Sequence, residues 1–203
     1  MISMVLGLSG PSGSGKSTLA NEIHRRLTDS VILQQDWYFI NSADCPPDAN
    51  FCDPKWLDID LFVTNLRHLK KGSPAAVPAV DFASFARVGT LTLQPAPLII
   101  VEGMTIFRIA EIADCFDLRY YLDTSFDVLA ERKRARDKSE RLKPAAVIEA
   151  QLQWLADEHR QDAELRARPD VVLRSGETPV GELADEILEA VTQWIRHDPQ
   201  PPC

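Results

Sequence analysis

The chain has 203 residues, which suits one domain with a small appended lid and is too short for two full domains. Hydrophobic residues make up 45% of it and charged residues 26%, so there is enough apolar material to bury a sheet between layers of helix. The net charge of −8 argues against non-specific binding to nucleic acid or to an anionic membrane, because both need a basic surface, although it leaves room for a local phosphate pocket.

Strand and helix patterns alternate along most of the chain. Short, almost wholly apolar runs indicate strands buried on both faces, and apolar residues at a period of 3.6 indicate helices. In chain order the predicted elements are a strand at 2–9, a loop at 10–15, a helix at 17–27, a strand at 31–33, a loop at 41–54, a helix at 57–71, an irregular stretch with a possible small hairpin at 74–97, strands at 98–101 and 118–122, helices at 125–136 and 145–168, a strand at 171–173 and a helix at 183–195.

This alternation predicts the fold class. Right-handed strand–helix–strand units produce a parallel sheet, so the chain is predicted to be an α/β protein with a five-stranded parallel sheet flanked by helices. We expect a single domain at 1–197, with a short basic lid near 132–145, and a disordered, Pro-rich tail at 198–203. Ligands of such sheets bind beyond the carboxyl ends of the strands, so the residues at those ends are the candidates for a site.

The first predicted strand leads into a complete phosphate-loop pattern, G-x-x-x-x-G-K-[ST], at 10–17. Glycines let backbone amides approach phosphate oxygens, and the start of the following helix adds positive charge. Lys16 is expected to bridge the β and γ phosphates of ATP, and the Ser17 hydroxyl to bind Mg²⁺. A merely glycine-rich turn is the alternative, which the full match and its flanks disfavour. The predicted nucleotide-binding residues are Gly10, Ser12, Gly13, Ser14, Gly15, Lys16, Ser17 and Thr18, in a three-layer P-loop NTPase fold.

Acidic residues follow three further predicted strands. Asp36 is placed to act as a general base or to anchor a substrate hydroxyl, with a helix cap or turn as the alternative. Glu102 occupies the position of an acid that holds Mg²⁺ directly or through water, although it could simply cap the next segment; Asp36 is the alternative carboxylate partner of Ser17 for the ion. Asp123 is better explained as the cap of the helix at 125–136.

Seven basic residues gather within twelve positions of this acidic chain. Most of them are expected to form a solvated surface, while two or three act as a lid that closes over phosphates and excludes water. Arg132 and Arg136 share a helix face, since they are four positions apart. The full set is Arg132, Lys133, Arg134, Arg136, Lys138, Arg141 and Lys143.

With these residues placed, the chain resembles the uridine kinase family, including its phosphoribulokinase-like and nicotinamide riboside kinase members, over roughly residues 2–195. The resemblance implies Mg²⁺-dependent transfer from ATP to the 5′-hydroxyl of a nucleoside or a similar primary alcohol. It implies Asp36 as the catalytic aspartate, Glu102 as the second acid, and Arg132 and Arg136 as lid arginines. The loop at 174–177, with Arg174 and Gly176, falls where the family packs adenine. The motifs that carry it are Gly7–Thr18, Gln35–Phe39, Asn50–Pro54, Val80–Phe82 with Arg87, Val101–Gly103 and Arg132–Arg136.

The chain departs from the family at the acceptor side. Val80 and Phe85 stand where uridine kinases have a Tyr and a His that recognise the pyrimidine, and an apolar pair cannot hydrogen-bond a uracil edge. The sugar-binding aspartate falls on Cys52, with Asp53 one place later. The departures argue against uridine or cytidine as acceptor and leave open a nicotinamide-riboside-like molecule, a modified nucleoside or sugar, or another alcohol. Phe39 and Phe85 are candidate substrate-binding residues, with a place in the core as the alternative.

Two other classes of protein fit the phosphate loop. One is a P-loop ATPase or switch module that acts on a protein partner, although the guanine-reading motif of GTPases is absent from the sequence. The other is a binding protein that has lost catalysis, which the combination of Lys16, Ser17, Asp36 and Glu102 disfavours.

Cysteine usage and apolar runs bear on location. None of the four cysteines forms a Cys-x-x-Cys pair, so we expect free thiols in a reducing cytosol. No run reaches the roughly 18 apolar residues of a membrane span. The opening apolar segment lacks the basic flank and cleavage site of a signal peptide. We therefore expect a cytoplasmic protein. We also expect it to be a monomer or a small homo-oligomer, with a small-molecule alcohol as its partner.

Overall fold

The computed structural model describes residues 3–40, 53–82, 84, 86–139, 144–161 and 168–197. Several of the predicted features lie outside these ranges: most of the loop at 41–54, the tail at 198–203, and the side chains of Phe85, Cys52, Arg141 and Lys143. Among the described residues, no helix combines the length and apolar character needed to cross a bilayer.

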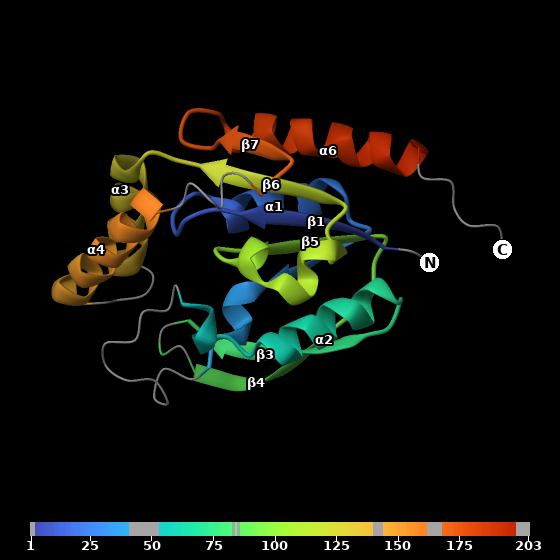
Figure 1. Cartoon of the computed structure of the whole chain (residues 1–203), viewed down its shortest axis with the longest axis horizontal. Coiled ribbons are helices and arrows are strands. Elements are labelled where there is room, and N and C mark those ends of the chain that lie inside the picture. The colour runs from blue at the N-terminus through green and yellow to red at the C-terminus, as the bar shows by residue number, and fades with distance from the viewer. Residues whose placement is uncertain are drawn as a thin grey trace.

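A five-stranded parallel sheet forms the centre of the molecule (Figure 1), which confirms the predicted α/β class. The strand order is β2-β5-β1-β6-β7. After the central strand β1 the chain forms β2 at one edge of the sheet, and β5 then lies between β2 and β1. The central strands are buried along their whole length, which explains their continuous apolar sequences. The strands span Met4–Ser9 (β1), Ser30–Gln34 (β2), Leu98–Gly103 (β5), Leu118–Asp123 (β6) and Val171–Arg174 (β7).

Two helical layers cover the sheet. Helices α1 (Lys16–Arg26) and α6 (Val180–His197) pack on one face, against alternate residues of the strands such as Leu6 and Ile100. Helix α2 (Ile59–Lys70) covers the other face together with short 3₁₀ helices at Ile106–Arg108 and Ala110–Cys115. The sequence did not predict these two 3₁₀ helices, and it placed the start of α6 three residues too late.

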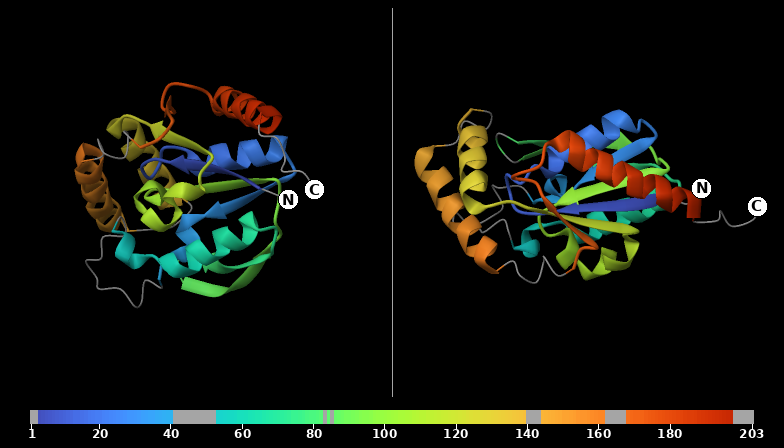
Figure 2. Two further views of the ribbon diagram at one scale, coloured as in Figure 1. Left: turned by 45° about the vertical axis from the view of Figure 1, so that its right-hand side comes forward. Right: turned by 90° about the horizontal axis from the view of Figure 1, so that it is seen from above.

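Helices α3 (Phe126–Ser139) and α4 (Ala145–Gln161) project from the carboxyl end of the sheet as a pair (Figure 2). They pack on each other through a small core of their own, made of Leu129, Ala130, Ile148, Leu152 and Leu155. We call this pair the α3–α4 hairpin. The predicted helix at 145–168 was too long, because Arg168 lies in a bend before β7.

The stretch predicted as irregular at 74–97 is largely regular. Strands β3 (Ala75–Asp81) and β4 (Ala86–Leu93) pair antiparallel, so the suggested small hairpin is confirmed and longer than expected. We call it the β3–β4 hairpin; it lies beside α2, apart from the main sheet (Figure 1). Its second strand is exposed over most of its length, so it lacks the apolar alternation that would have identified it.

Candidate active site

The phosphate loop joins β1 to α1 in a backbone shape that glycine permits. Gly10, Gly13 and Gly15 have φ of 147°, 90° and 97°, which side chains rarely allow. At Gly10 a Cβ would also lie 2.7 Å from the carbonyl oxygen of Leu122, so no other residue fits there. The loop therefore depends on its glycines for its conformation as well as for access to a ligand.

Ser14 supplies direct support for a phosphate ligand. Its side chain is only 1% exposed, and its hydroxyl meets no hydrogen-bonding partner within the described parts of the chain. A buried hydroxyl without a partner is costly, so such a group is expected to bind something that the protein itself does not provide. A phosphate oxygen in the loop would satisfy it.

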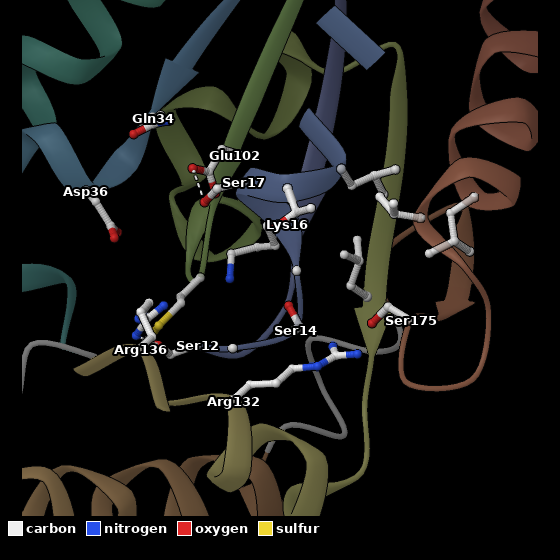
Figure 3. Close-up of a pocket in the computed structure, with 18 of the residues that line it drawn as sticks. Ser12, Ser14, Lys16, Ser17, Gln34, Asp36, Glu102, Arg132, Arg136 and Ser175 are labelled. Atoms are coloured by element: carbon white, nitrogen blue, oxygen red, sulfur yellow. Dashed lines mark hydrogen bonds between the residues drawn. The ribbon is translucent and has the colours of Figure 1, made fainter. Parts of the chain in front are cut away.

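Lys16 begins α1 and is almost completely buried, with 8% exposure. Its Nζ donates to the carbonyl oxygen of Pro11 across 2.9 Å, which holds the ammonium inside the curve of the loop. Figure 3 shows this ammonium pointing into the cavity between Asp36 and the loop. A buried cation at this place can neutralise the oxygens of a bound phosphate.

Ser17 and Glu102 lie side by side at the edge of this cavity. Ser17 Oγ donates to Glu102 Oε1 across 2.9 Å. Glu102 is the fifth residue of β5 and is 5% exposed, so it belongs to the strand itself and does not follow it as the sequence suggested. The pKa of Glu102 is raised to about 7: burial is the largest cause and nearby Asp36 contributes, while Lys16 and the Ser17 hydrogen bond act in the opposite direction.

Asp36 lies in a 3₁₀ helix, Gln35–Tyr38, that follows β2 directly. It is half-buried, and Gln34 rather than Asp36 occupies the cap position of this short helix. In Figure 3 its carboxylate faces the same space as Lys16 and Arg136. Asp36 is therefore not the N-cap, although it does lie in the first turn of this 3₁₀ helix, as the turn alternative had it.

The residue before Asp36 is held from behind by β5. Gln35 is 1% exposed, and its Oε1 accepts a hydrogen bond from the amide of Thr105 across 3.0 Å. Gly103 makes this close approach possible, since a Cβ there would collide with the Gln35 side chain. Sequence analysis did not find this contact, because its partners are 70 positions apart.

The α3–α4 hairpin reaches the phosphate loop through Arg136. Its Nη2 donates to Ser12 Oγ across 3.2 Å, and its Nε donates to Asp137 Oδ1 across 3.1 Å. Asp137 is fully buried and also accepts from Lys133 Nζ at 2.7 Å, while Lys133 reaches Gln151 of α4. Most of the basic residues at 132–143 were expected to form a solvated surface. Lys133 does not, because its side chain is buried.

The other described basic residues of α3 behave differently. Arg134 pairs with Glu149 of α4 on the exposed surface, at 2.8 Å. Arg132 is exposed on its helix and also lines the cavity over the phosphate loop, near Ser175 (Figure 3). The shared face of Arg132 and Arg136 thus points to the phosphate loop.

The cavity over the phosphate loop has a volume of about 720 Å³. It brings together the loop, Gln34, Asp36, Glu102 and both arginines, and Phe82 and Met104 add apolar surface that sequence analysis had not assigned to a site. A neighbouring cavity of about 460 Å³ contains Arg174, Gly176 and Asp123. Its full lining is Asp123, Thr124, Ser125, Val128, His159, Arg174, Gly176 and Glu177.

Comparison with known proteins agrees with this geometry. The model of the phosphoribulokinase/uridine kinase family matches residues 5–161. This chain belongs to that family. It is accordingly an ATP-dependent small-molecule kinase.

Individual relatives and structures fit this membership. The uridine kinase of Borreliella burgdorferi strain ZS7 is 36% identical over 141 residues, which cover 68% of each chain. A Silicibacter sp. TM1040 structure, described provisionally as a fructose transport system kinase, aligns with a TM-score of 0.67 and 20% identity over 85% of this chain and 90% of its own. A Bacillus stearothermophilus structure described as a possible uridine kinase aligns with a TM-score of 0.61 and 20% identity. The alignment covers 86% of this chain and 90% of that structure's chain. The two structures support the fold alone.

Two of the remaining predicted substrate residues of this phosphoribulokinase/uridine kinase family member, Phe39 and Asp53, are not part of the cavity lining. Phe39 is half-buried and packs on the core under α2, the alternative that had been left open. Asp53 pairs with Lys55 at 2.8 Å on the surface, and the hydrogen bond from that ammonium lowers the pKa of Asp53. Phe85 is outside the described residues.

The oxygen atoms of Ser17 and Glu102 suit a magnesium ion in this family member. Within the described ranges, no group of three or more His, Cys, Asp or Glu side chains could hold a metal. Magnesium is usually bound by one or two protein oxygens and completed by phosphate and water. The adjacent oxygens of Ser17 and Glu102, next to the phosphate loop, fit that pattern.

Proposed function

We propose that this kinase transfers the γ-phosphate of ATP to a primary hydroxyl of a nucleoside-like or sugar-like molecule, with Asp36 as general base. The observation that carries the proposal is the convergence of Lys16, Asp36 and Arg136 on one cavity beside the phosphate loop. An ammonium, a carboxylate and a guanidinium in that arrangement can bind a phosphate, activate a hydroxyl and neutralise the charge that moves between them.

The phosphates of ATP would lie in the loop at 10–17. Its amides and the Ser14 hydroxyl would donate to their oxygens, and Lys16 would neutralise the β and γ groups. The adenine would extend past Ser175 to the cavity that contains Arg174 and Gly176. A Cβ at Gly176 would lie 3.3 Å from the Thr124 side chain, so glycine here lets the turn after β7 pack closely on Thr124.

Ser17 and Glu102 would hold Mg²⁺ between them. When bound, the ion supplies positive charge that neutralises the β- and γ-phosphate oxygens. The ionised form of Glu102 is the one that binds a cation. Its pKa of about 7 therefore makes the site sensitive to pH near neutrality.

Phosphoryl transfer itself needs a proton acceptor and cations that neutralise the charge on the transferred group. Asp36 accepts the proton of the acceptor hydroxyl as its oxygen attacks the γ-phosphorus, and the bond from that phosphorus to the β–γ bridging oxygen breaks to release ADP. Lys16 and Arg136 stabilise the transferred group from two sides. Arg136 and Arg132 belong to the α3–α4 hairpin, whose closure would exclude water and so limit hydrolysis of ATP.

The apolar surface of the cavity bears on the acceptor class. Phe82 and Met104 line the same cavity as Asp36, and Phe82 follows the β3 strand that carries Val80. The Borreliella burgdorferi relative is a uridine kinase, which supports a nucleoside-like acceptor. Val80 cannot hydrogen-bond a uracil edge, however, so uridine and cytidine are disfavoured relative to a ribosyl pyridine, a modified nucleoside or a modified sugar.

A panel of acceptors tests the proposal. ADP release would be measured with ATP and Mg²⁺ in the presence of uridine, cytidine, nicotinamide riboside, other nucleosides and simple sugars. We expect release to depend on one class of added alcohol and to be slow without it. Equal release in the absence of any acceptor would instead indicate an ATPase or switch module.

A further inference from the structure

A second arginine, far from the α3–α4 hairpin, holds the backbone that carries Asp36. Arg87, near the start of β4, donates from Nη2 to the carbonyl oxygen of Tyr38 across 3.0 Å and from Nε to that of Phe39 across 3.2 Å. Its Nη1 donates to Asp58 Oδ2 across 3.1 Å. One guanidinium therefore engages two successive carbonyls and a carboxylate, which requires the fixed fork of donors that only arginine has.

The segment held in this way comes directly after Asp36 and is also fixed to the start of α2. The Asp58 amide donates to the Tyr38 carbonyl across 2.8 Å, and the Ile40 amide donates to Trp56 across 2.9 Å. Asp58 in turn caps α2, since its Oδ1 accepts from the Leu61 amide. Arg87 thus closes a junction between the Asp36 segment, α2 and the β3–β4 hairpin.

A bulge in the β3–β4 hairpin accompanies the turn of Arg87 toward this junction. Ala79 pairs with Gly89 and Val80 pairs with Arg87, so Val88 is the extra residue on β4. Bulges re-aim neighbouring side chains. Val88 is 68% exposed, whereas the Arg87 side chain is only 26% exposed and faces the Asp36 segment.

We infer that Arg87 is a positioning residue for phosphoryl transfer: it keeps residues 38–40 in place and thereby sets the distance between the Asp36 carboxylate and the phosphate loop. The inference rests on the proposed function. Arg87 does not line the cavity, so it acts through the Tyr38 and Phe39 carbonyls and not on the substrate. Because a shift of about 1 Å in a reacting group can cost about 100-fold in rate, a modest loosening of this segment has a large effect.

Three variants test this role by steady-state kinetics. Arg87→Met removes all three donors, and kcat should fall about 10- to 100-fold, whereas KM for ATP should stay close to the parent value because the phosphate loop is untouched. Arg87→Lys should be intermediate, since one ammonium cannot serve three separate acceptors. Arg119→Met is the matched control, because Arg119 of β6 pairs at 2.9 Å with Asp170, the residue before β7, and lies outside the cavity lining.

Hydrogen–deuterium exchange provides a readout that does not depend on the acceptor. The amides of Ile40 and Asp58 should lose protection in Arg87→Met, while those of β1 should keep it. Unchanged protection, or a kcat equal to that of the parent, would overturn the inference. The inference would also be overturned if the loss of kcat or of amide protection merely followed the unfolded fraction measured in a melting curve. If the parent shows no acceptor-dependent turnover while the variant loses protection, the proposed function fails and the structural role of Arg87 stands.

Discussion

Arg136 of α3 and Ser12 of the phosphate loop are 124 positions apart in the chain, yet Arg136 Nη2 donates to Ser12 Oγ across 3.2 Å. The contact joins the tip of the α3–α4 hairpin to the loop that receives phosphate. Under the proposed function, the guanidinium would therefore already lie beside the loop that receives the phosphates and would need little reorganisation to act on the transferred group.

Arg136→Met should consequently lower kcat by about 100-fold or more, because one donor to the transferred group is lost. The affinity for ATP should change less, since the loop and Lys16 remain. Kinetics with saturating acceptor would measure the loss. Arg134→Met serves as the control, because Arg134 pairs with Glu149 on the exposed surface of the same helix. An equal loss in both variants would contradict the special position of Arg136.

Lys16→Met should abolish measurable transfer, with a fall in kcat of at least about 100-fold. The physical reason is that Lys16 is buried and its ammonium is held inside the curve of the phosphate loop, where the phosphates would lie under the proposed function. ADP release and calorimetric titration with ATP and Mg²⁺ would both be measured. Lys71→Met, at the exposed end of α2, should behave like the parent. Parent-like turnover of Lys16→Met would remove the basis of the proposed function.

Asp36→Asn should lower kcat by about 10²- to 10⁴-fold, the usual contribution of a general base. Binding of ATP and Mg²⁺ should remain nearly intact, because the phosphate loop and Ser17 are unchanged. The two quantities separate in a kinetic assay combined with a binding titration. Should Asp36→Asn retain full activity, the base would have to be sought elsewhere in the cavity.

Because of Glu102, we expect the free energy of unfolding of the metal-free, nucleotide-free protein to depend on pH. Burial raises its folded pKa from 4.5 to about 7, so the folded state binds the proton more tightly than the unfolded chain. The resulting stabilisation is fully present below pH 4.5 and is lost as pH rises through 7. From the size of the pKa shift, the loss amounts to at most about 3 kcal/mol.

Thermal melts of the parent and Glu102→Gln in EDTA between pH 5 and pH 8 would measure this effect. The variant cannot ionise at this position, so its stability relative to the parent should increase toward pH 8. A constant difference across the range would show that Glu102 keeps an ordinary pKa in the fold.

The buried pair of Lys133 and Asp137 should matter for stability. Removing one partner, as in Lys133→Met, leaves the buried Asp137 with only the partly exposed guanidinium of Arg136 as its charged partner, and should cost up to about 3–5 kcal/mol. The double variant Lys133→Met/Asp137→Leu removes both charges and should melt closer to the parent. The exposed pair of Arg134 and Glu149 provides the comparison, since its disruption should barely move the melting curve. A single variant that melts like the double variant would argue against a buried ion pair.

Much of the fold was predictable because its signals are local. β1 and β5 are continuous apolar runs, since both faces of each strand are covered by helices. The phosphate loop was found from eight consecutive residues, and Asp36 from its place at the end of a strand. In each case the residues that determine the structure are neighbours in the sequence.

The missed features depend on contacts between distant or exposed residues. β4 is exposed on most of its length, so no apolar alternation marked it as a strand. Lys133 looked like one more member of a basic surface, because its burial comes from packing against α4. The Gln35–Thr105 bond and the three acceptors of Arg87 join segments that only the folded chain brings together.

The separate core of α3 and α4 has a kinetic consequence. Because this core packs the two helices against each other, we expect them to move as one unit, with Arg132 and Arg136 moving together. Under the proposed function, release of ADP would then depend on motion of the whole α3–α4 hairpin and not on single side chains. A substitution at Leu152, which lies in this core and outside the cavity lining, should therefore change the rate of turnover.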